Sequence, residues 1–337
     1  MPNHIPNASY TESQPISFAE AFELINPHLY TVEERIRAQA KSFDPAVEGY
    51  VSYVCGAGGK RLRPALALLS AGATGKITAS HVDLAVILEL IHIATLVHDD
   101  IMDGAELRRD QASANAKWGN AITVLLGDCL FAHALRLSTN FSNSDICRRI
   151  ADAASEVCSG EIIQTQRRHD LKLSTADYYR IIEMKTAALF TAACELGAFI
   201  SEASPTVIGS LKTYGTKLGV AYQIYDDILD LAGNEDESGK TLGTDLQKGK
   251  FTLPVLLMLQ SGKDVGELRK ILLNEDSERA EALAQMLREA GTIDAAKKIA
   301  ERLIAECLEQ LNGIQDNRYA RGLRSIPEHL RHLLSKL

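Results

Sequence analysis

Two clusters of aspartates share one spacing and stand far apart in the chain. In sequence order they are Asp99, Asp100 and Asp103, followed by Asp226, Asp227 and Asp230. On a helix, residues four positions apart lie about 40° apart, so the first and last aspartate of each cluster share one face. Like charges this close destabilise a helix, and more so beside an apolar wall, so we expect a cation between them. Ligands that are all oxygens favour Mg²⁺, which also binds substrate phosphates.

For one cluster alone, a solvated acidic helix end is the simpler interpretation. Each cluster, however, closes a long apolar stretch, and a matching pair on apolar helices is harder to explain in that way. The duplication therefore favours a site in which metal ions and a diphosphate lie between two acidic faces.

Such a site requires cationic side chains, and the sequence supplies them in short groups. The first is Gly58-Gly59-Lys60-Arg61-Leu62-Arg63-Pro64, where the glycines permit close backbone approach and the proline fits the first turn of a helix. We interpret it as a phosphate seat. An ordinary basic surface loop fits the same residues about equally well.

Two more basic groups follow the aspartate clusters. Arg108 and Arg109 come after the first cluster, and a glycine-spaced, lysine-bearing stretch at 239–250 comes after the second. That stretch predicts a mobile loop over a phosphate, and it is not a P-loop because Asn234 stands where glycine is required. The formal net charge of -8 argues against nucleic acid or an anionic membrane surface as a partner.

Together these motifs resemble those of the trans-isoprenyl diphosphate synthase family, from Lys60 to Pro254. They occur in the family's order and spacing: GGKRLRP at 58–64, ExxH at 89–92, DDIMD at 99–103, LRR at 107–109, WGN and LLGD within 118–128, KT at 185–186, YQIYDDILD at 222–230 and GKTLGTDLQKGKFTLP at 239–254. After Arg109 the family commonly has Gly-Lys-Pro, whereas this chain has Asp110-Gln111-Ala112. This departure puts substrate preference in question more than reaction type.

The resemblance implies a role for each matching residue. The diphosphate of isopentenyl diphosphate is expected at Lys60, Arg63, His92 and Arg109. The allylic diphosphate is expected at Arg108, Lys185, Thr186, Gln223, Lys240 and Lys250. Direct Mg²⁺ ligands are expected at Asp99, Asp103 and Asp226, with Asp100, Asp227 and Asp230 as supporting carboxylates and three ions when substrate is bound. His92 also fits a core histidine, but it lies on nearly the helix face of Asp99, which favours the ligand role.

The implied reaction is head-to-tail prenyl transfer. Mg²⁺ and cationic side chains stabilise the departing diphosphate, and the double bond of isopentenyl diphosphate attacks the allylic cation. A proton is then lost to the released diphosphate, and the product is five carbons longer. The residues expected to carry this chemistry are Asp99, Asp103, Asp226, Arg108, Lys185 and Lys240.

By the same resemblance, product length depends on side chains below the first aspartate cluster. Short-chain members have bulky residues four and five positions before the first aspartate, and this chain has Thr95 and Ala94 there. Ile91 and Phe131 are deeper candidates for the floor of the tunnel. We predict a polyprenyl product of C30 to C40, with a farnesyl or geranylgeranyl diphosphate synthase, making C15 or C20, as the alternative.

Two other classes of protein share part of this pattern. A terpene cyclase or a head-to-head condensing enzyme has an aspartate cluster and carbocation chemistry, but it lacks the basic seat at 58–64 for a second diphosphate. A non-catalytic subunit of a heteromeric synthase is expected to have lost aspartates, whereas both clusters are complete here. Both classes are therefore less favoured.

The fold expected is all-α, with one helical domain at 17–337 around a central prenyl-chain cavity, after a disordered tail at 1–16. Ser17 and Ser80, each three residues before an acidic residue, predict helix N-caps. No uninterrupted run reaches about 18 apolar residues, so no membrane span is expected. The resemblance implies a homodimer. Six cysteines without CxxC spacing favour buried free thiols and the cytoplasm, although the C-terminal Ser-Lys-Leu also matches a peroxisomal address.

Overall fold

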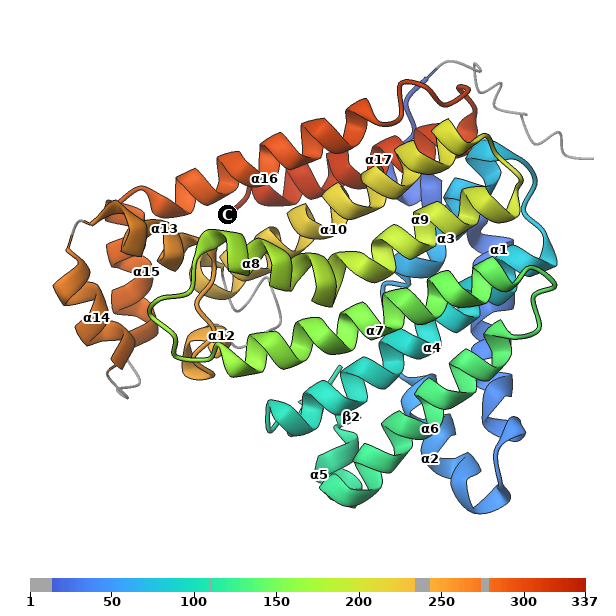
Figure 1. Cartoon of the computed structure of the whole chain (residues 1–337), viewed down its shortest axis with the longest axis horizontal. Helices are drawn as coiled ribbons and strands as arrows, with labels where there is room; N and C mark the ends of the chain where they lie inside the picture. The colour runs from blue at the N-terminus through green and yellow to red at the C-terminus, as the bar shows by residue number, and fades with distance from the viewer. Residues whose placement is uncertain (1–13, 110, 234–242, 263, 274–278) are drawn as a thin grey trace, which may run out of the picture.

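The structure, a computed structural model, describes residues 14–109, 111–233, 243–262, 264–273 and 279–337. This part of the chain is a bundle of helices with one short pair of strands, which confirms the all-α prediction (Figure 1). The first half contains α1 (Phe18–Ala38), the 3-10 turn η1 (Gln39–Ser42), α2 (Pro45–Gly56), α3 (Leu62–Thr74), α4 (Ala79–Met102), the antiparallel strands β1 (Leu107–Arg108) and β2 (Gln111–Ala112), α5 (Ala114–Trp118), α6 (Asn120–Ser138) and α7 (Ser144–Gln166). The second half contains α8 (Thr175–Ile182), the π-helical turn η2 (Glu183–Ala187), α9 (Ala188–Ile200), α10 (Pro205–Ala232), α12 (Thr244–Gln247), α13 (Leu253–Ser261), α14 (Val265–Leu273), α15 (Arg279–Glu289), α16 (Thr292–Glu309) and α17 (Arg318–Leu334).

Helix α4 runs through the core of the bundle. Its sequence contains no glycine or proline, most of its residues are buried, and it packs against α3, α6 and α9. Helix α10 packs against α9, η2 and α16 (Figure 1). Because α4 and α10 end in the two aspartate clusters, the core packing of these two helices fixes where both clusters lie.

One of the two predicted helix caps is confirmed and the other is wrong. The Ser17 hydroxyl accepts a hydrogen bond from the Glu20 N–H at 3.2 Å, and the Glu20 carboxylate accepts one from the Ser17 N–H at 2.7 Å. Helix α4, by contrast, begins at Ala79 and not after Ser80. The ring of His81 accepts a hydrogen bond from the Thr78 N–H at 3.0 Å, so Thr78 occupies the cap position.

Helices α4 and α6 are long and apolar enough to cross a membrane when judged by length and composition alone. In α4, 72% of the most apolar window is buried inside the protein, as expected of a core helix. In α6 the share is 39%, because the side of this helix that does not pack on α4 exposes Ile122, Val124 and Leu125. The absence of a membrane span therefore stays a prediction.

The structure tests the expected N-terminal tail and the expected buried cysteines only in part. The predicted tail at 1–16 lies outside the described residues except for 14–16, so it and the domain boundary stay predictions. All six cysteines are free, as expected, but burial is uneven. Cys55, Cys194 and Cys307 are buried, whereas Cys129 and Cys158 are exposed.

Candidate active site

Both aspartate clusters contribute to one cavity of about 740 Å³. Asp99 and Asp103 enter it from the end of α4, and Asp226 and Asp227 enter it from α10. The other lining residues that the sequence singles out are Arg63, His92, Thr95, Arg108, Arg109, Phe131, Lys185, Thr186, Gln223 and Lys250. The structure thus brings two acidic faces and the basic groups to one place.

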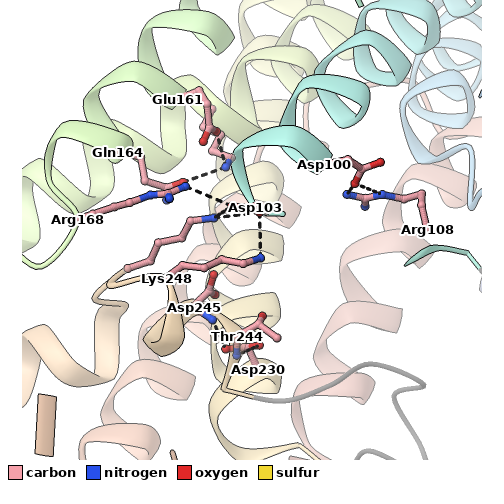
Figure 2. Close-up of polar contacts among 12 residues, drawn as sticks. Asp100, Asp103, Arg108, Glu161, Gln164, Arg168, Asp230, Thr244, Asp245 and Lys248 are labelled. Carbon is pink, nitrogen blue, oxygen red and sulfur yellow. Dashed lines mark hydrogen bonds and ion pairs between the residues drawn. The ribbon is translucent and has the colours of Figure 1, made fainter. Parts of the chain in front are cut away.

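The three aspartates of the first cluster have different surroundings. Asp100 is buried and does not line this cavity. It accepts hydrogen bonds from the Arg108 guanidinium, from Nε at 2.8 Å and from a terminal nitrogen (Figure 2). Burial nevertheless raises the pKa of the Asp100 carboxyl. This aspartate therefore holds Arg108 in place beside the cavity.

Asp103 is surrounded by cations. Its carboxylate lies 3.1 Å from Lys248 Nζ, 3.2 Å from Arg168 and 3.3 Å from Lys250 Nζ. Figure 2 shows Lys248 and Arg168 converging on it from two sides. Burial alone would raise its pKa, but the two lysines outweigh this effect and lower the pKa. Three cations are therefore gathered at the mouth of the first cluster.

In the second cluster Asp227 is buried and held by protein donors. Tyr178 donates its hydroxyl hydrogen to one carboxylate oxygen at 2.6 Å, and Gln223 Nε2 donates to the other at 2.7 Å. The Gln223 carbonyl in turn accepts a hydrogen bond from Thr186 at 2.7 Å. These bonds link α8, η2 and α10 and fix the start of the cluster.

Asp230, the last aspartate of that cluster, is not among the residues that line the cavity. It accepts hydrogen bonds from the Thr244 N–H at 3.2 Å, the Thr244 hydroxyl at 2.8 Å and the Asp245 N–H at 3.1 Å (Figure 2). It therefore caps the first turn of α12 and brings Asp245 to the cavity lining. Of the second cluster, Asp226 and Asp227 line the cavity.

The carboxyl groups of the cavity are crowded in a way that suits a bound cation. Loss of solvation, together with Glu161 and Asp103, raises the pKa of Asp99 to about 6. Loss of solvation, together with Asp230 and Asp226, raises the pKa of Asp245 to about 6. Among the described residues, no three His, Cys, Asp or Glu side chains converge tightly enough to form a ready metal cluster. The all-oxygen donors nevertheless fit Mg²⁺, which binds through few carboxylates and completes its shell with water and phosphate.

Arginines and a histidine form the basic end of the cavity. Arg63, Arg109 and His92 line it, with the Arg63 guanidinium 5.1 Å from the centre of the Phe190 ring. Loss of solvation and the neighbouring Arg63 and Arg109 hold the pKa of His92 well below its usual value, so this ring is neutral. Lys60 is exposed and does not line the cavity.

Lys185 and Thr186 lie on η2, a turn of π-helix between α8 and α9. Such single turns add one residue to a helix and are frequent at functional sites. Lys185 Nζ contacts Glu161 and donates to the Gln164 side-chain oxygen at 2.9 Å. Burial would lower the pKa of Lys185, but Asp99 and Glu161 raise it. Gly160 permits the close packing of α7 on η2, since a Cβ there would lie 2.6 Å from the backbone nitrogen of Lys185.

Two of the four residues predicted to set product length line the cavity, and two do not. Thr95 and Phe131 line the cavity. Ile91 and Ala94 are fully buried beside it and are not part of its lining, which agrees with the helical offset between Ala94 and Asp99. Lys240, predicted to contact the allylic diphosphate, lies outside the described residues.

Several residues at the cavity were not singled out from the sequence. Asp245 and Lys248 belong to the 239–250 stretch, whose lysine-rich and glycine-spaced pattern does not distinguish these two residues. Tyr178 has the pattern of a packing residue, and its hydroxyl contact with Asp227 depends on the tertiary fold. Arg168 follows α7 without a motif.

Tyr178→Phe is expected to lower the free energy of unfolding by about 1–3 kcal/mol, because the change leaves a buried Asp227 oxygen without its donor. Tyr179→Phe is the matched control, since the ring of this neighbour makes an edge contact with the Tyr178 ring at 5.6 Å between centroids and is only half-buried. It should change stability by less than about 0.5 kcal/mol. Urea unfolding of both variants makes the comparison, and equal losses would contradict the role of the hydroxyl.

Asp99→Asn is expected to stabilise the metal-free protein at neutral pH. Because the Asp99 pKa of about 6 lies above the ordinary 3.8, the folded protein binds a proton more readily than the unfolded chain between these values. The ionised carboxylate therefore costs stability above pH 6, on the order of 1–3 kcal/mol, and the cost shrinks as the pH falls. Denaturant unfolding in EDTA should show the variant more stable at about pH 7.5 and closer to wild type at about pH 5. A less stable variant at the higher pH would refute the assignment.

A family profile, relatives of known name and solved structures all resemble this chain over most of its length. The sequence profile of the polyprenyl synthetase family matches residues 44–290. The chain is 33% identical over 316 residues to heptaprenyl diphosphate synthase component 2 of Bacillus subtilis, which covers 94% of this chain and 90% of that protein. It is 32% identical over 305 residues to the geranylgeranyl diphosphate synthase of Methanosarcina mazei, with 86% and 94% covered. A crystal structure of a polyprenyl synthase from Caulobacter crescentus, complexed with calcium and isoprenyl diphosphate, is similar with a TM-score of 0.87 and 32% identity, covering 95% of this chain and 98% of that one.

Proposed function

The chain belongs to the polyprenyl synthetase family and is a trans-prenyltransferase, and from that premise we propose a Mg²⁺-dependent synthase of long all-trans polyprenyl diphosphates. Its substrates are isopentenyl diphosphate and an allylic diphosphate. The observation that carries the proposal is a single cavity lined by two acidic clusters and two groups of cations. The calcium and isoprenyl diphosphate in the Caulobacter structure support a divalent cation and a diphosphate at this site.

The residues of the acidic end serve the allylic substrate. Asp99, Asp103 and Asp226 would hold Mg²⁺, which when bound stabilises the charge that develops on the departing diphosphate. Lys185 and Lys250 lie beside the same carboxylates and donate hydrogen bonds to the diphosphate oxygens as that charge grows. Apolar lining residues below them, among them Leu96, Val157 and Leu189, exclude water from the allylic cation.

The residues of the basic end serve isopentenyl diphosphate. Arg63 and Arg109 supply guanidinium forks, which match phosphate geometry. His92 lines the cavity with them, and its imidazole would donate an N–H to a phosphate oxygen. The reacting double bond is thereby held between the two ends of the cavity.

A second cavity supports a product of C30 to C40. It measures about 590 Å³ and is lined by Ser80 and Ile87 of α4 together with ends of α6, α7, α9 and α10. At the helical rise, Asp99 lies about 18 Å from Ile87 and about 28 Å from Ser80 along α4. An isoprene unit has four chain bonds of about 1.5 Å and spans roughly 5 Å when extended, so a tail of six units reaches that depth. Ile91 and Ala94 are fully buried on α4 between Ile87 and Asp99, and we propose that the tail passes beside them.

Product analysis tests this proposal directly. The purified protein, given Mg²⁺, a C15 primer and excess isopentenyl diphosphate, is expected to release C30 to C40 products. Thr95→Phe should shorten them to C15 or C20, because Thr95 lines the cavity about 6 Å below Asp99 along the helix. Thr139→Phe, at an exposed position after α6, is the matched control and should leave product length unchanged. A wild-type product of C15 or C20 contradicts the long-chain proposal, and no prenyl transfer contradicts the enzyme.

An exposed apolar face supports a homodimer. Val124 on α6 and Ile162 on α7 line the active-site cavity yet are 42% and 59% exposed, and Cys158 between them is also exposed. A second copy covering this face would close the cavity wall and keep water from a growing apolar tail. We also propose the cytoplasm as the location, since six free thiols suit a reducing compartment. Light scattering of the purified protein should give twice the mass of the chain.

A further inference from the structure

A buried ionic cluster lies directly behind the basic end of the cavity. Arg61 is 6% exposed, and its guanidinium contacts two carboxylates. One terminal nitrogen lies 2.7 Å from Glu89 of α4, and the other lies 3.2 Å from Glu33 of α1, which Nε also contacts. Arg61 and both glutamates lie outside the cavity lining, so none of them is placed to touch substrate.

The backbone around Arg61 is fixed by the same guanidinium. Arg61 has φ 48° and ψ 37°, a left-handed conformation that costs roughly 1 kcal/mol or more in a residue with a side chain. Its terminal nitrogen also donates to the Ala57 carbonyl at 3.4 Å, and Arg109 donates to the same oxygen at 3.1 Å. Gly59 packs so tightly on the Arg109 guanidinium that a Cβ there would lie 2.8 Å from it. The turn is thus held between Arg61 behind it and Arg109 in front.

These contacts of Arg61 affect both the positions of Arg63 and His92 and the charge behind the diphosphate seat. Arg63 follows Arg61 by two residues on the same turn, and His92 follows Glu89 by three on α4. Movement of Arg61 would therefore shift the two groups that face isopentenyl diphosphate. Without Arg61, moreover, the buried Glu89 carboxylate would lose its ion pair, and Glu33 would be left with Arg37 at 3.9 Å, close to the seat of an anionic diphosphate.

We propose that Arg61 is a positioning residue for isopentenyl diphosphate, which clamps the 57–63 turn to α1 and α4 and neutralises Glu33 and Glu89 behind the diphosphate seat. This inference rests on the proposed function. It assigns Arg61 a role in binding one of the two substrates, and none in ionising the other.

The test compares Michaelis constants for the two substrates. Arg61→Met is expected to raise the KM for isopentenyl diphosphate about 10-fold to 100-fold, while the KM for the C15 primer and kcat change by less than about 3-fold. Arg61→Lys keeps the positive charge but loses the paired N–H donors of the guanidinium. Its KM for isopentenyl diphosphate should therefore lie between those of Arg61→Met and the wild type. The matched control is Lys217→Met, because Lys217 of α10 forms an ion pair between two helices, with Glu306 of α16 at 2.6 Å, and neither residue lines either cavity. It should leave both constants unchanged.

A double variant separates the effect of neutralising Glu89 from the effect of clamping the 57–63 turn. If the neutralising charge matters, Arg61→Met with Glu89→Gln should regain part of the lost affinity for isopentenyl diphosphate. Circular dichroism and thermal unfolding show whether each variant folds, and Arg61→Lys and Glu89→Gln carry the test if Arg61→Met does not. Equal increases in both KM values, or a fall in kcat alone, would overturn the proposal. Absence of turnover in the wild type would instead refute the proposed function.

Discussion

Replacement of Asp99 by asparagine is expected to reduce turnover by about 10³-fold or more while the helical circular dichroism stays unchanged. Asparagine keeps the size and one oxygen of the side chain but removes the charge that would hold the divalent ion. The carboxylate lies at the cavity next to Lys185 and Asp103, where the diphosphate must leave. The same change is expected to make the metal-free protein more stable, so inactivity would not come from unfolding.

Asp128→Asn is the matched control for that result. Asp128 lines the same cavity, but its side chain is 62% exposed and lies 3.4 Å from the ring of His98. Its loss should change turnover by less than about 3-fold, since this exposed carboxylate belongs to neither aspartate cluster. Steady-state assays at saturating Mg²⁺ make the comparison. Substantial activity in Asp99→Asn at any Mg²⁺ concentration would remove Asp99 from the metal ligands.

Arg63→Met is expected to have the second largest effect, a rise of about 100-fold in the KM for isopentenyl diphosphate. The Arg63 guanidinium lines the cavity over the Phe190 ring, and its Nε is buried without a hydrogen-bond partner among the described residues. A diphosphate oxygen would satisfy that atom, and methionine cannot. The KM for the allylic primer should change far less.

Arg148→Met controls for loss of a positive charge. Arg148 is exposed on α7 and pairs with Asp145 at 2.7 Å, far along the helix from the cavity lining. Initial rates measured while each substrate is varied in turn make the comparison. A primer KM that rises as much as the KM for isopentenyl diphosphate would show that Arg63 does not distinguish the two diphosphates.

The repeated chemistry of the site could be predicted from the sequence because it depends on local spacing. Asp99 and Asp103 share a helix face by helical geometry alone, and the same holds for Asp226 and Asp230. The structure places the first pair together at the cavity as that geometry requires. The second pair separates, because Asp230 is drawn to the backbone N–H groups at the start of α12. No spacing rule contains that contact, which depends on where the chain returns.

Two other unpredicted contacts share this cause. Tyr178 reaches Asp227 and Arg168 reaches Asp103 across the fold, between segments whose proximity no local pattern announces. The sequence pattern favours Ser80 as the cap of α4, but the cap is Thr78, because a histidine ring can replace the acidic partner of a capping box, as His81 does. The π-helical turn that carries Lys185 and Thr186 likewise has no signature in composition.

The three positive side chains around Asp103 would couple the binding of a diphosphate to the binding of a divalent ion. In the metal-free protein Arg168, Lys248 and Lys250 act as internal counter-ions. A diphosphate that competes for those counter-ions would free the carboxylate to bind a divalent ion. Binding of each ligand would then strengthen binding of the other by the same factor, so we expect either ligand alone to bind more weakly.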